Sequence, residues 1–206
     1  ESALYSNTTG SSNTANGYEA LYSNTTGSSN TATGYRSLQF NTASNNTAVG
    51  FQALNANTTG SSNVAVGVDS LILNTTGGNN SAYGREALYS NTTGGSNTAI
   101  GYGSLSSNTA GYRNTAIGSN ALIDLNITDI TGVGSNTAVG FQTGQGITTG
   151  INNTILGANV TGLSASTVYY ARVKAQTAGC LDSVWSNNDG ISTSGPLAIV
   201  THPASQ

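Results

Sequence analysis

The chain has 206 residues, a net charge of −3 and only 6% charged residues, against roughly 25% in an ordinary soluble domain. Its five cationic side chains are scattered, which argues against phosphate-driven binding of nucleic acid. No apolar stretch approaches the ~20 residues of a membrane span, so we expect no membrane insertion by these residues.

The sequence repeats the segment Asn-Thr-Ala-x-Gly. Nine copies begin at Asn13, Asn30, Asn46, Asn63, Asn80, Asn97, Asn114, Asn136 and Asn153, with spacings of 17, 16, 17, 17, 17, 17, 22 and 17 residues. The low apolar content alone would predict disorder, but repetition lets weak contacts stack in columns. The first residues already match the second half of the unit, so we expect a fragment whose export signal and anchor lie outside it.

Each unit predicts a β-coil rather than a helix pair. The opening segment is followed by Ala-Leu or Ser-Leu, as at Ala20 and Leu21, and then by an Asn-rich turn such as Asn24–Gly27. Gly, Asn, Thr and Ser are poor helix formers, and helical repeats need roughly 33 residues or more. We therefore expect one strand, a corner, a second short strand and a glycine turn. About nine such 17-residue coils, stacked in parallel at ~4.8 Å, would span on the order of 40 Å.

Alternation along the strand assigns its two faces. In the sixth copy Asn97 and Ala99 share one face, whereas Thr98 and Ile100 share the other. The alanine face can fill the coil interior, but a thin coil cannot also bury the second face, and small cores commonly depend on oligomerisation. We therefore predict lateral association of protomers through the column Val49, Val66, Ile100, Ile117, Val139 and Leu156.

Two further features of the repeat carry structural predictions. The Asn that opens each copy is expected to stack along the axis and to hydrogen-bond backbone groups of the turns. The long spacing between Asn114 and Asn136 predicts an inserted loop, and the segment Phe141–Ile147 lacks the usual Leu.

The copies Asn97–Gly101, Asn114–Gly118 and Asn136–Gly140 resemble the YadA-like head repeats of trimeric autotransporter adhesins, which carry a Ser/Thr-x-Ala-Ile-Gly core. The resemblance covers about residues 1–158 and implies an all-β parallel roll, homotrimeric about one axis, that binds host surfaces. The 17-residue unit is longer than the family's commonest coil. Similar repeats occur in other trimeric bacterial fibres and in some phage tail fibres, so a phage tail fibre stays an alternative.

Residues 159–206 depart from the repeat and resemble the later strands of a fibronectin type III domain. Leu163 and Tyr169 lie six residues apart before an alternating strand. We expect a small β-sandwich-like tip domain after the shaft of residues 1–158. Exposed aromatic and polar groups suit a glycan or a protein surface. The predicted ligand-binding residues of this tip are Tyr170, Arg172, Lys174, Trp185 and Asp189.

No set of residues predicts catalysis. The chain has one His and one Cys, without a nucleophile triad, paired acids or metal-ligand spacing, so we expect no enzyme activity, cofactor or metal. The favoured function is an extracellular or cell-surface homotrimeric fibre or adhesin. An ice-binding or other lattice-binding solenoid is the alternative, because one Thr column recurs regularly with interruptions at Val64 and Ser81. That column is Thr14, Thr31, Thr47, Thr98, Thr115, Thr137 and Thr154.

Overall fold

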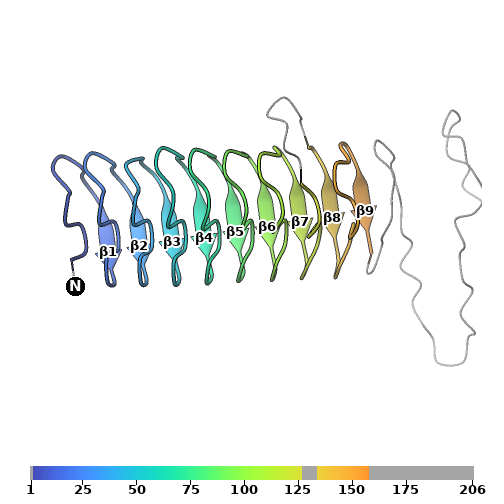
Figure 1. Ribbon diagram of the computed structural model, residues 1–206, viewed down its shortest axis with the longest axis horizontal. Coiled ribbons are helices and arrows are strands. Elements are labelled where there is room, and N and C mark those ends of the chain that lie inside the picture. The colour runs from blue at the N-terminus through green and yellow to red at the C-terminus, as the bar shows by residue number, and fades with distance from the viewer. Residues whose placement is uncertain (1, 127–133, 158–206) are drawn as a thin grey trace, which may run out of the picture. The chain divides into compact units, whose positions relative to one another are not determined.

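The described part of the chain is a parallel β-solenoid (Figure 1). The computed structural model describes residues 2–126 and 134–157. Nine three-residue strands form one sheet in sequence order, and each strand pairs in parallel with the next. They are β1 (Thr14–Asn16), β2 (Thr31–Thr33), β3 (Thr47–Val49), β4 (Val64–Val66), β5 (Ser81–Tyr83), β6 (Thr98–Ile100), β7 (Thr115–Ile117), β8 (Thr137–Val139) and β9 (Thr154–Leu156). The prediction of an all-β stack of parallel coils is therefore confirmed for these residues, which contain no helix.

The alanine column fills the interior of the solenoid. Each coil is numbered here by its strand, and it starts at the Asn before that strand. Strand pairing sets alanine opposite alanine from Ala15 to Ala138, and Ile155 takes the last place. From Ala32 onward the column is fully buried, whereas the residue after each of these points outward and is partly exposed. The predicted assignment of the two strand faces is confirmed.

The predicted second strand is wrong. The segment that contains Leu21, Leu38 or Leu54 forms turns, because each of these residues has a φ of +50° to +52°. A left-handed non-glycine residue costs roughly 1–2 kcal/mol. Each Leu is fully buried, which contributes about 1.5–3 kcal/mol. Its N–H also donates to the next coil, at 3.0 Å from Leu54 N to Ser70 O. Stacking therefore offsets the strained backbone.

Two ladders of buried Asn side chains hold the turns. In the ladder that opens each coil, Asn46 Oδ1 accepts the N–H of Asn63 at 2.9 Å, and Asn46 Nδ2 donates to Gly60 O at 2.9 Å. In the second ladder, Asn57 Nδ2 donates to Asn41 Oδ1 at 2.7 Å and to the same Gly60 oxygen at 2.8 Å. The predicted stacking of the first Asn column is thus confirmed, and its side chains satisfy backbone groups inside the coil.

The second ladder stops where the repeat becomes irregular. Leu125 and then Ile147 occupy its place, so Asn108 Oδ1 is left buried without a hydrogen-bond partner. In coil 8 the Leu position is Gly144, and a Cβ there would lie 2.7 Å from a methyl group of Leu122 and 3.1 Å from one of Ile155. The larger Ile155 thus fills the volume that the missing Leu vacates. Most of the predicted inserted loop, residues 127–133, lies outside the described residues.

Candidate binding surfaces

The predicted interface column lies on the outer face of the strands. Its exposed members, such as Ile100 and Val139, are 37–41% exposed in the single chain, and Val66 is half-buried. A second outward column lies two residues after the first, directly behind the glycine that follows each strand. We call the two columns together the strand-side band: Val49, Val66, Tyr83, Ile100, Ile117, Val139 and Leu156 with Tyr18, Tyr35, Phe51, Val68, Tyr102 and Phe141.

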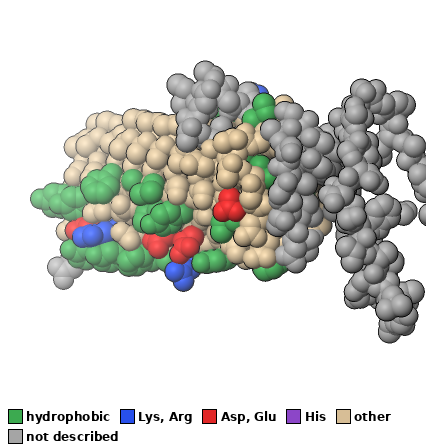
Figure 2. Space-filling view, turned by 45° about the vertical axis from the view of Figure 1, so that its right-hand side comes forward, with side chains coloured by type: hydrophobic (Ala, Val, Ile, Leu, Met, Phe, Trp, Pro, Cys, Tyr) green, Lys and Arg blue, Asp and Glu red, His purple; other side chains and the backbone are tan. Residues whose placement is uncertain are grey.

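A second apolar band was not predicted from the sequence. It lies after the buried Leu of each coil, and we call it the corner-side band: Tyr5, Tyr22, Phe40, Ile72, Leu73, Tyr89 and Ile123. Figure 2 shows hydrophobic side chains in two rows, with acidic and basic side chains between them. The signal in the sequence was faint, because the apolar residue alternates between the first and second place after Leu, as in Tyr22 and Phe40.

Aromatic rings in these bands stack along the solenoid axis. Tyr18, Tyr35 and Phe51 have ring centroids 5.2–5.3 Å apart and nearly parallel planes. Tyr5 and Tyr22 stack in the same way at 5.1 Å. Because neighbouring rings cover one another's faces, the stacks present mainly ring edges to solvent. This arrangement suits side-chain packing better than the face-on stacking of a flat ligand.

A row of charged and amide side chains separates the two bands. In coils 1 and 2, Glu19 Oε2 accepts hydrogen bonds from Arg36 Nε at 2.8 Å and from Gln39 Nε2 at 2.7 Å. The hydrogen bond of the Tyr18 hydroxyl with Glu19 raises the pKa of Tyr18. The charges at this end of the row are therefore already paired within the chain.

The row becomes acidic in coils 4 and 5. Asp69 and Glu86 occupy equivalent places in adjacent coils, and Arg85 Nη2 lies 2.9 Å from Glu86 Oε1. Asp69 Oδ1 is buried without a hydrogen-bond partner. Burial, and then the neighbouring Glu86 carboxylate, raise the pKa of Asp69. The Asp69 carboxylate therefore has an unsatisfied hydrogen-bond acceptor.

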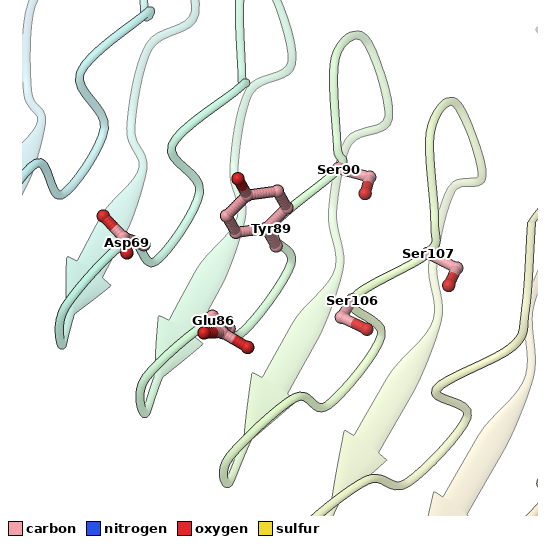
Figure 3. A pocket seen from close by; sticks show the side chains of 6 residues that line it. All are labelled: Asp69, Glu86, Tyr89, Ser90, Ser106 and Ser107. Atoms are coloured by element: carbon pink, nitrogen blue, oxygen red, sulfur yellow. The ribbon is translucent and has the colours of Figure 1, made fainter.

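A shallow hollow surrounds these two carboxylates (Figure 3). Its lining is oxygen-rich and comes from three successive coils: Asp69, Glu86, Tyr89, Ser90, Ser106 and Ser107. Residues 2–126 and 134–157 contain no group of three His, Cys, Asp or Glu side chains that could hold a metal. The hollow is thus a negatively charged surface that offers hydrogen-bond acceptors.

The threonine column on which the lattice-binding alternative rests is in register, but its side chains are only partly exposed to solvent. Thr31 pairs with Thr47, and Thr98 pairs with Thr115, whereas Val64 and Ser81 break the run. All of its threonines except Thr14 are half-buried. The column also lies beside the exposed apolar column of the strand-side band. A crystal lattice would therefore meet apolar side chains before hydroxyl groups.

The predicted tip site lies outside the described residues. This applies to Tyr170, Arg172, Lys174, Trp185 and Asp189, so their role stays a prediction. Among the described residues there is no helix of a length and hydropathy that could cross a membrane. No family model matches the chain, and no curated protein or solved structure matches it significantly.

Proposed function

We propose that residues 1–158 form the shaft of an extracellular homotrimeric fibre whose C-terminal residues bind a surface glycan or protein. The observation that carries this proposal is the exposure of two rows of apolar side chains along the described solenoid, of which the corner-side row is interrupted at Asn55 and at Ser106. Each band runs along roughly 40 Å of stacked coils and is about 10 Å wide, which gives ~400 Å². The largest apolar patch of a typical soluble monomer covers roughly 300–600 Å² and is often functional, and this chain carries two bands of that order.

Repetition favours a shaft over a catalytic scaffold. The strands of successive described coils stack in register, so contacts that one protomer makes with another add up along the axis. The interior is already satisfied by the Ala and Leu columns and by the Asn ladders, so the outer bands are not needed to complete the monomer core. The resemblance to YadA-like head repeats supports three protomers rather than another number.

Purified protein is expected to sediment as three copies at micromolar concentration. Replacing Ile100 and Ile117 by Asn removes apolar surface from the centre of the strand-side band, and we expect this variant to dissociate into folded monomers. Asn suits the position, because Asn16 occupies it in coil 1. Analytical ultracentrifugation gives the mass, and circular dichroism checks the fold.

The matched control introduces the same residue type on another surface. Ser62 and Ser96 lie exposed in turns with φ of +58° and +57°, where Asn is well tolerated. The variant Ser62→Asn, Ser96→Asn should remain trimeric. A wild-type protein that is a folded monomer at micromolar concentration would contradict the proposal, as would equal dissociation of both variants.

The proposed tip is tested separately on a glycan array. Trp185→Ala in the full chain is expected to lose most binding to any glycan that the wild type retains, because an exposed indole supplies a large apolar contact. Ile100→Asn, Ile117→Asn protein serves as a reference for loss of avidity alone. Equal binding by the wild type and Trp185→Ala would remove Trp185 from the site.

A further inference from the structure

The strand-side and corner-side bands differ in chemistry, and this difference bears on how protomers meet. A closed ring of protomers uses head-to-tail contacts, in which one patch of each protomer meets a different patch of the next. The solenoid offers two such patches, separated by the charged row (Figure 2). A two-fold dimer would need only one self-complementary patch.

Charge distinguishes the two patches in the middle of the solenoid. Among the described residues, Arg85 is the one charged side chain in either column of the strand-side band. Its side chain is 64% exposed, and its guanidinium lies 6.0 Å from the centre of the Tyr102 ring. The corner-side band, in contrast, borders the hollow that contains Asp69 and Glu86.

The two features lie at the same level of the stack. Arg85 follows β5, and the hollow is lined by residues of coils 4, 5 and 6, so it is centred on coil 5 (Figure 3). Rotation about an axis parallel to the solenoid leaves every coil at its own height. Patches that meet in a parallel ring must therefore lie on the same coil, and Arg85 and the hollow satisfy this condition.

On the basis of the proposed trimer, we infer that Arg85 of each protomer enters the hollow of its neighbour and lies between Asp69 and Glu86. The guanidinium has five N–H donors, and the hollow offers carboxylate and hydroxyl oxygens that can accept them. Asp69 Oδ1 is buried and has no partner within the chain, and it gains one when the carboxyl group rotates toward the entering guanidinium. The apolar bands on either side would exclude water from this contact.

The ion pair between Arg85 and Glu86 within one chain does not prevent Arg85 from binding in the hollow of the neighbouring protomer. The two are consecutive in the sequence, and their ion pair is exposed, which makes it worth little. Across a contact that excludes water, a charge pair gains both strength and specificity. The pair would also fix the axial register, because sliding one protomer by a coil in either direction would take Arg85 away from one of the two carboxylates, with Gln52 or Gly103 in its place.

Charge reversal tests the inference in the full chain. Asp69→Arg and Arg85→Glu, made singly, should each raise the concentration at which the trimer half dissociates by about tenfold or more. The double variant restores opposite charges across all three contacts, so it should return to within about threefold of the wild type. Arg fits the position of Asp69, since Arg36 occupies the same place in coil 2 with a φ of +54°.

Arg113→Glu is the control for a change of net charge. Arg113 is exposed in a turn, outside both bands, and its reversal should leave the dissociation concentration unchanged. A double variant no better than the worse single variant would overturn the inference while the proposed trimer stands. A wild-type monomer would overturn the proposed function itself.

A cross-linking measurement locates the contact independently. In a Cys180→Ser background, a short bis-maleimide, which replaces the span of the Arg side chain, should join Arg85→Cys of one protomer to Ser106→Cys of its neighbour and give a covalently closed trimer on a denaturing gel. Either substitution alone should give no cross-linked species. Covalent dimers from Arg85→Cys alone would place Arg85 on the three-fold axis beside its own copies, and would also overturn the inference, as would a product without any trimer band.

Discussion

Asn63→Asp is expected to destabilise the solenoid by about 3–5 kcal/mol at pH 7. Asn63 is fully buried, and its Nδ2 donates to Gly77 O at 2.8 Å. The substitution replaces that donor by a carboxylate oxygen, so two acceptors would face each other without water. The opposite oxygen would still accept the N–H of Asn80, which recovers only part of the loss.

The pH dependence of this variant has a definite sign. Burial without a cation raises the pKa of the new carboxyl above its unfolded value of about 3.9. The folded state then binds more protons than the unfolded state, so the stability of the variant falls as pH rises from the unfolded pKa to the folded pKa. Urea unfolding followed by circular dichroism should show a smaller deficit relative to wild type at pH 4 than at pH 7.

Asn79→Asp makes the same chemical change on the surface. Asn79 lies exposed in a turn with a φ of +59°, a conformation that Asp also adopts. Its urea midpoint should stay close to that of the wild type at both pH values. Equal midpoints for Asn63→Asp and Asn79→Asp would show that the ladder contributes little to stability.

The sequence was sufficient to predict those features that recur at a fixed spacing. The alanine column and the first Asn ladder follow from the repeat itself, because stacking in register brings equivalent residues of successive coils together. For the same reason the outward direction of Ile100 and Val139 could be predicted from Ala99 and Ala138 alone. Only the alternation of a strand was needed for this step.

Features that depend on backbone conformation could not be predicted in this way. Leu is rarely found at positive φ, so Leu38 and Leu54 were expected to extend a strand. Stacked hydrogen bonds and burial outweigh that local preference. Gly144 leaves space in the Leu column of one coil, and Ile155 in the Ala column of the next coil fills it. This compensation joins two different columns, so comparing residues within a single column does not predict it.

The candidate binding surfaces were predicted only in part. The strand-side band follows a strict column, whereas the corner-side band shifts by one residue between Tyr22 and Phe40. The hollow combines side chains of three coils, and no single repeat contains its whole lining. Association through one band alone was therefore the simpler hypothesis from the sequence, and the second band adds a surface of different chemistry to the proposed association.

Gly67→Ala is expected to cost more than about 3 kcal/mol, because two effects add. Gly67 has a φ of +139°, which L-residues rarely adopt. A Cβ at this place would lie 2.5 Å from Gly84 O and 2.6 Å from Gly84 C, both backbone atoms of the next coil. The neighbouring coil can relieve that contact only by moving away, which would break the bond from Gly84 N to Val66 O.

Gly78→Ala provides the matched comparison, since it adds the same methyl group one turn away in the same coil. Its nearest neighbour would be Ser61 O at 3.1 Å, and Ser28 and Ser61 show that a side chain is accepted at this position of the repeat. We expect thermal unfolding to report a large loss for Gly67→Ala and a small change for Gly78→Ala. Similar melting temperatures for the two variants would mean that adjacent coils are less tightly coupled than their carbonyl contacts indicate, and the cooperative stacking inferred for the shaft would lose its main support.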